Sequence, residues 1–197
     1  MPMLLPAFLF IMWILLLYIL KKLKMQFFVF ILGSVGLFGF AMYVGVAKLE
    51  KHLEYAVAYT LDYIGKCTGI FDAYPEYAMI TVYYKRQALS FFVDYECSGI
   101  IETLVYICLL LFYPIYSVII KIAYSLAGAL YILAANIVRV FMICAIAKVW
   151  GPSSFFLSHT VGGRILFFIL MVVLYYRVFT YGHIKWQKVG GETDGNQ

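Results

Sequence analysis

The stretch that decides the fold is IAYSLAGALYILAANIVRVFMICAIA, residues 122–147. It is longer than the roughly 20 apolar residues that cross a hydrocarbon core of about 30 Å, and only Asn136 and Arg139 interrupt it with strongly polar groups. The whole chain has the same character, since 65% of its residues are hydrophobic and 13% are charged. About a quarter of the residues in soluble domains are charged. The sequence therefore predicts a helical integral membrane protein that uses lipid as solvent for its apolar surface.

Working outward from this stretch, we expect an all-α polytopic fold with about five transmembrane helices. The first candidate span starts like a signal peptide, but it lacks a basic n-region and a small-residue cleavage site, so we treat it as a span. Small residues in the second, Gly33, Gly36 and Gly39, predict close helix packing. The five spans cover residues 3–20, 26–47, 99–116, 122–147 and 163–181.

The basic residues of the short loops fix the direction of the chain. With five spans they all fall on one side, which the positive-inside rule makes cytoplasmic. We therefore expect a multi-pass protein of the cell membrane with its N-terminus outside, its C-terminus inside, and residues 48–96 and 148–162 outside. The net charge of +5 is a sign of topology here, not of nucleic-acid binding. The residues concerned are Lys21, Lys22, Lys24, Lys121, Arg177, Lys185 and Lys188.

Residues 48–96 form the extracytoplasmic insertion. Apolar residues recur at helical spacing in its first part, which predicts an amphipathic helix near the membrane interface. Two β-rich runs, 79–84 and 89–93, flank Lys85-Arg86-Gln87 and predict a β-hairpin. The expected organisation is two helices over 1–47, the insertion over 48–96, a three-helix catalytic core over 97–182 and a cytoplasmic tail over 183–197. The amphipathic positions are Leu49, Leu53, Ala56, Val57, Thr60 and Ile64.

A cysteine marks the outer mouth of the third span. Cys97 lies in Glu96-Cys97-Ser98-Gly99, where a helix N-terminus lowers a thiol pKa and favours the nucleophilic thiolate. The alternative is that Cys97 is a small buried hydrophobic residue, which is what we expect of Cys108 and Cys144 inside apolar spans.

Two further polar groups reach the same side of the membrane. Asn136 and Arg139 share one helix face, and Arg139 lies about 27 Å along the helix beyond Lys121, in the outer half of the membrane. An ionisable residue in a span is a functional candidate, whereas the alternative is snorkelling to the interface. His159 precedes the fifth span, also outside; taken alone, it would be an ordinary solvated loop residue.

Together the three side chains predict acyl transfer at the outer surface. Cys97 supplies a nucleophile, Arg139 a fixed positive charge for an oxyanion, and His159 proton transfer near neutral pH. No Cys/His pair has the spacing of metal ligands, and we expect neither a metal nor another cofactor.

These motifs, in this order, resemble the exosortase/archaeosortase family of membrane cysteine transpeptidases. The matching elements are Glu96-Cys97-Ser98-Gly99, residues 136–139 (Asn-Ile-Val-Arg) and His159-Thr160-Val161-Gly162. The short length and single insertion look most like the compact Gram-positive branch, exosortase G. Many relatives have more spans upstream, whereas this chain has two.

The resemblance implies a substrate protein that ends in a recognition motif, a transmembrane helix and a basic tail. Cys97 would form an acyl-enzyme thioester that an unknown amine acceptor resolves. Arg139 would stabilise the oxyanion, His159 would act as acid and base, and Asn136 would hydrogen-bond within the site.

Three hypotheses accompany this interpretation. Glu102 either orients Arg139 or forms a purely structural pair with it. The hairpin either walls or extends a peptide-binding groove, or it merely covers the bundle. A Cys67–Cys97 disulfide would consume the nucleophile. A non-enzymatic membrane scaffold or assembly factor is the main rival interpretation, and a small transporter ranks last because the inner halves of the spans are almost wholly apolar.

Overall fold

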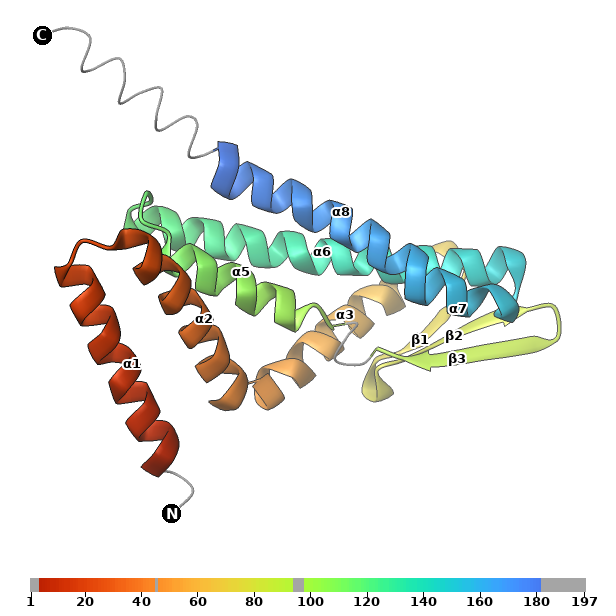
Figure 1. The fold of residues 1–197 in the computed structure, drawn as a ribbon. Coiled ribbons are helices and arrows are strands. Elements are labelled where there is room, and N and C mark those ends of the chain that lie inside the picture. Colours follow the sequence, from red (N-terminus) through yellow and green to blue (C-terminus); the bar gives the residue numbers. More distant parts are fainter. Residues whose placement is uncertain (1–3, 45, 94–97, 182–197) are drawn as a thin grey trace, which may run out of the picture. The chain divides into compact units, whose positions relative to one another are not determined.

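The computed structural model describes residues 4–44, 46–93 and 98–181, and Figure 1 shows the order of their elements. Two compact units make up the chain: residues 1–46 with 101–127, and residues 47–100 with 128–197. The elements are α1 (Leu4–Lys22), α2 (Gln26–Val44), α3 (Val46–Thr68), β1 (Asp72–Tyr74), η1 (Pro75–Tyr77), β2 (Met79–Tyr84), β3 (Gln87–Phe92), α5 (Ile100–Phe112), α6 (Val118–Trp150), η2 (Pro152–Ser154), α7 (Phe155–Leu157), η3 (Ser158–Gly162), α8 (Gly163–Tyr175) and η4 (Tyr176–Tyr181).

The helical membrane fold with a small β insertion is confirmed. Among the described residues, three helices are long and apolar enough to cross a membrane: Gln26–Val44, Val118–Trp150 and Pro152–Tyr181. The predicted first and third spans are also helical, as α1 and α5, but α5 has only 13 residues. A total of five spans stays a prediction.

In the first unit, α1 and α2 form an antiparallel helical hairpin. The indole Nε1 of Trp13 donates a hydrogen bond of 2.9 Å to the Leu32 carbonyl, and the rings of Phe10 and Phe40 stack with centroids 4.4 Å apart. A Cβ on Gly36 would collide with Trp13, and one on Gly33 would collide with Phe112. The predicted role in close packing is therefore confirmed for these two glycines, but it is wrong for Gly39, where a Cβ would meet no atom within 4 Å.

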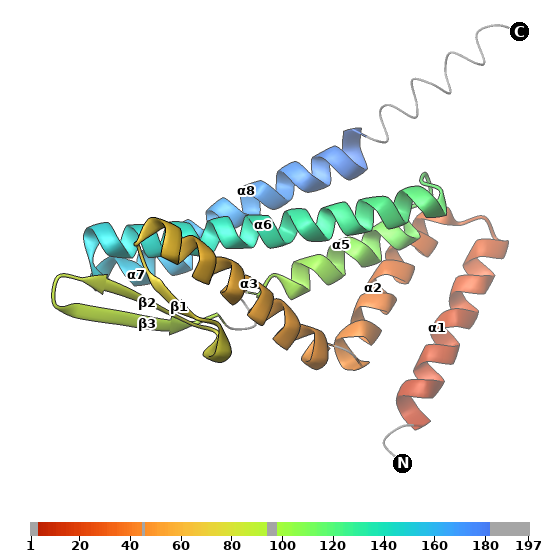
Figure 2. The ribbon, with the colours of Figure 1, turned by 180° about the vertical axis from the view of Figure 1, so that it is seen from behind.

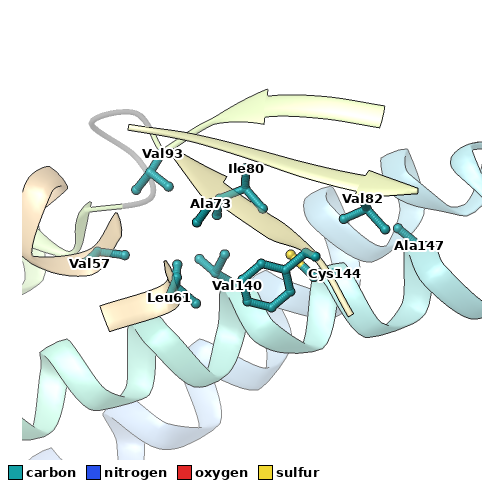
Figure 3. Close-up of a cluster of buried hydrophobic side chains, with 10 residues drawn as sticks. Val57, Leu61, Ala73, Ile80, Val82, Val93, Val140, Cys144 and Ala147 are labelled. Carbon is teal, nitrogen blue, oxygen red and sulfur yellow. The ribbon is translucent and has the colours of Figure 1, made fainter. Parts of the chain in front are cut away.

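In the second unit, a hydrophobic core joins α3, the sheet and the C-terminal part of α6, as Figure 3 shows. The predicted amphipathic helix is confirmed, and its most buried apolar side chains pack on the sheet and α6. Its place near the membrane interface stays a prediction. Burial of apolar area stabilises this packing by about 25 cal/mol per Å². The fully or nearly fully buried members of the core are Val57, Leu61, Phe71, Ile80, Val82, Val93, Val140, Cys144 and Ala147.

The predicted β-hairpin is confirmed, with one addition. β2 pairs antiparallel with β3 from Tyr84↔Gln87 to Met79↔Phe92, so Gln87 belongs to the strand and not to the turn. The short strand β1 pairs antiparallel with β2 and makes a three-stranded sheet of order β1-β2-β3. Lys85 adopts φ +53° in the turn, a conformation that favours glycine. This explains why the turn carried no strong sequence signal.

α6 is longer than the span predicted for it. Its 33 residues correspond to about 50 Å of helix, well beyond a hydrocarbon core of about 30 Å. The core places the side chains of Val140, Cys144 and Ala147 against α3 and the sheet. The C-terminal part of α6 thus supports the insertion, and the strands lie beside it in Figures 1 and 2.

Candidate active site

α6 carries the two polar residues predicted within its span. Asn136 is fully buried and Arg139 is 7% exposed, and they are three positions apart, so both lie on one face of the helix. The guanidinium carbon of Arg139 lies 4.9 Å from the ring centroid of Phe167 on α8. A cation over an aromatic face is stabilised by the ring quadrupole, most strongly where water is excluded. Arg139 is therefore a buried cation held between two helices, not a side chain that extends into solvent.

A glycine at the start of α8 allows this close approach. A Cβ on Gly163 would lie 3.3 Å from Cγ of Arg139 and 3.0 Å from Cδ1 of Ile143. Both distances are shorter than ordinary van der Waals contact, so any side chain at position 163 would press on the stem of Arg139.

His159 lies in a helix, and the prediction of a loop at this position is wrong. The chain from Phe155 to Tyr181 is continuously helical, and His159 occupies the π-helical turn η3, which closes with the Gly163 N–H donating to the Ser158 carbonyl. A π-turn inserts an extra residue per turn and is frequent at functional sites. A loop was predicted because Ser158 and Gly162, at the two ends of η3, are residues typical of loops.

Aromatic rings fix the surroundings of His159. Its imidazole stacks on Phe155 with centroids 5.4 Å apart and planes inclined by 26°. The ring of Phe155 in turn packs against the ring of Phe91 in β3, with the two centroids 5.0 Å apart. The half-buried histidine is therefore connected through two rings to the sheet.

The segment that follows Cys97 packs on α6. Ser98 and Ile100 are buried, and Gly99 has φ +73°. A Cβ on Gly99 would lie 3.8 Å from Cβ of Asn136. Residues 98–100 are thus anchored beside the polar face of α6. Cys97 and Glu96 themselves lie outside the described residues.

In the second unit, the segment of Ser98 and the helical turn of His159 thus pack against the stretch of α6 that carries Asn136 and Arg139. Glu102 belongs to the first unit, so its pairing with Arg139 stays a prediction. Within the described residues, no group of three or more His, Cys, Asp or Glu side chains could hold a metal ion.

The other cysteines differ in their surroundings. Cys108 and Cys144 are buried, which confirms their predicted role as hydrophobic residues. Cys67 is exposed at the end of α3 and carries a free thiol. Cys97, its partner in the hypothetical Cys67–Cys97 disulfide, lies outside the described residues.

Sequence reasoning missed the residues that hold the site, above all Phe155, Gly163 and Phe167. Phe167 follows Gly163 by four residues and so shares its helix face, a spacing that could have revealed it. Phe155 lies in the segment that was wrongly predicted as a loop, so its helical position beside His159 was not expected.

Fold and site together define a polytopic membrane protein in which α6 carries a buried arginine and a buried asparagine, and the helical segment that follows carries a half-buried histidine. A family model of transmembrane exosortases matches residues 1–176, and the chain belongs to that family. The predicted family is thereby confirmed, whereas the exosortase G type stays a prediction. No curated protein and no solved structure matches the chain.

Proposed function

We propose that this chain is a membrane cysteine transpeptidase that cleaves a C-terminal sorting signal of exported proteins. The observation that carries the proposal is Arg139, a cation buried beside Asn136 and covered by Phe167. Burying a guanidinium is costly, so a chain that retains one requires a compensating use for it. Stabilisation of a developing oxyanion is such a use.

The chemistry assigns one role to each residue. The Cys97 thiolate attacks the scissile carbonyl carbon, and the negative charge on the tetrahedral oxygen is stabilised by Arg139. The C–N bond then breaks, and His159 donates a proton to the leaving amine. An amine acceptor loses a proton to His159, attacks the thioester and releases Cys97. Asn136 and Ser98 support the first step by hydrogen bonding, and we assign Glu96 and Glu102 supporting roles outside that step.

The substrate is a protein with a motif, a transmembrane helix and a basic tail, processed at the extracytoplasmic face of the cell membrane. A site at that face suits a peptide bond just outside the substrate's helix. The amine acceptor remains unnamed, and water in its place would give simple hydrolysis.

The test compares Cys97→Ala with Cys67→Ala in cells that carry the chain. We expect one or more membrane proteins to keep their C-terminal helix in Cys97→Ala cells, and to be processed normally in Cys67→Ala cells, because Cys67 is an exposed thiol outside the site. Mass spectrometry of membrane fractions detects the retained helix. A secreted reporter fused to the C-terminal region of such a protein then provides an assay for purified enzyme in lipid nanodiscs.

The assay distinguishes the enzyme from a scaffold. A mass adduct on Cys97 that matches the reporter's N-terminal fragment, lost in Cys97→Ala, is the expected result. Unchanged processing in both Cys97→Ala and His159→Ala cells would favour the non-enzymatic scaffold instead.

A further inference from the structure

The outer edge of β3 offers a row of backbone groups. β3 is an edge strand in the order β1-β2-β3. In an antiparallel pair, alternate residues turn both backbone groups toward the partner, and the residues between them turn both groups away. The Val93 N–H donates to the Ala78 carbonyl at 2.7 Å, which fixes the phase of this alternation. The N–H and C=O groups of Ala88, Ser90 and Phe92 therefore point away from β2.

This edge is uncovered in the part of the chain that the structure describes. Ala88 and Ser90 are exposed, and Phe92 is 63% exposed. No backbone hydrogen bond from another described segment reaches these three residues. Proteins usually protect an open edge with proline, an inward charge or a covering element. β3, with the sequence Gln-Ala-Leu-Ser-Phe-Phe, has neither a proline nor a charge.

The edge also leads to the candidate active site. At the turn end of the hairpin, Gly151 lies so close to Tyr84 that a Cβ there would be 2.9 Å from its ring. At the other end, Gly99 lies beside Asn136. β3 therefore runs back along α6, from the end of that helix toward its polar residues, and Phe91 contacts the Phe155 ring that stacks on His159.

We propose that the extended segment of the substrate that precedes its scissile bond adds to the outer edge of β3 as a fourth, parallel strand. This proposal rests on the proposed function. The exported part of the substrate lies outside, and its C-terminal helix lies in the membrane. From N- to C-terminus the substrate therefore runs toward the membrane. β3 runs in the same direction, because the sequence continues from it to Cys97 and the third predicted span. Main-chain hydrogen bonds to Ala88, Ser90 and Phe92 then provide binding, and the alternating side chains of the peptide provide specificity.

A proline at position 88 tests the edge directly. Ala88→Pro removes an outward N–H without removing a hydrogen bond of the sheet, whereas Ala88→Val keeps that N–H. One hydrogen bond contributes roughly 2- to 10-fold in binding. For the reporter in nanodiscs, we expect KM to rise by about that factor in Ala88→Pro and to change less than about 2-fold in Ala88→Val. Unchanged iodoacetamide labelling of Cys97 would show that the site itself is intact.

A second measurement uses the unaltered enzyme, so it is independent of how the proline variant folds. A series of synthetic peptides has the reporter's sequence up to and across the scissile bond. Each peptide carries one N-methyl group, at a different residue of the segment. We expect inhibition of reporter processing by these peptides to be lost at every second position, because only alternate amides of an added strand face β3. A uniform profile, or Ala88→Pro matching Ala88→Val, would overturn the added strand. Normal processing by Cys97→Ala would instead overturn the proposed function.

Discussion

The contact between Gly163 and Arg139 allows a matched comparison of two neighbouring glycines. A Cβ on Gly163 would lie 3.0 Å from Cδ1 of Ile143 and 3.3 Å from Cγ of Arg139. A Cβ on Gly162 would meet only Cε of Met142, at an ordinary 3.6 Å. Both residues are helical, so alanine stabilises the helix by up to about 1 kcal/mol at either position. At position 163 alone, overpacking costs about 1–3 kcal/mol.

The two variants should therefore differ in both stability and activity. Gly162→Ala should raise the Tm of the protein in nanodiscs by about 2–4 °C, and Gly163→Ala should leave it unchanged or lower it by up to about 8 °C. Arg139 is held over Phe167 and cannot yield freely, so Gly163→Ala shifts the guanidinium by a few tenths of an ångström. We expect its kcat on the reporter to fall about 10-fold, because a catalytic group that is displaced from its productive position stabilises the transition state less well.

Thermal unfolding and reporter kinetics on the same preparations check this comparison. If Gly163→Ala matched Gly162→Ala in both Tm and kcat, the contact between α8 and the stem of Arg139 would not position the guanidinium, and the reasoning would fail.

Three other predictions concern the ring over Arg139, the exposed thiol and the core. Phe167→Leu should lower kcat/KM on the reporter by about 2- to 30-fold through loss of the cation–π contact, and Phe167→Tyr should restore most of it. A membrane-impermeant maleimide applied to intact cells should label Cys67 and spare buried Cys144; labelling of Cys67 only after lysis would reverse the predicted topology. Ile80→Ala, a truncation at a fully buried position, should cost about 2–5 kcal/mol of stability, and a Tm within 2 °C of the unaltered protein would contradict the core described here.

The membrane fold was predictable because it depends on long apolar runs that need no knowledge of neighbours. α6, the hairpin and α3 were all anticipated from periodicity and composition. The three-residue strand β1 was not, because so short a strand exists only through its pairing with β2. The packing of α3 on the sheet was also missed, since an apolar face looks the same in sequence whether lipid or protein covers it.

The candidate site was predictable only in part. Arg139 and Asn136 stood out because polar groups are rare inside apolar segments. Their partners Phe167 and Phe155 did not, since aromatic residues are abundant throughout this chain. The helical setting of His159 escaped notice because a π-turn has no sequence signature comparable to a capping residue or a turn glycine.

The two faces of α6 have a consequence for how the length of this chain can vary. Asn136, Arg139 and Ile143 lie on the face of α6 that packs against residues 98–100 and α8. Cys144 and Ala147 lie on the face that packs in the core against α3 and the sheet. A single residue inserted between Arg139 and Cys144 would rotate everything beyond it by about 100° and would turn Cys144 and Ala147 away from the core. The hairpin turn imposes no such phase, because added residues there leave the register of β2 and β3 intact. Insertions should therefore be tolerated at Lys85-Arg86 and should abolish activity within this stretch of α6.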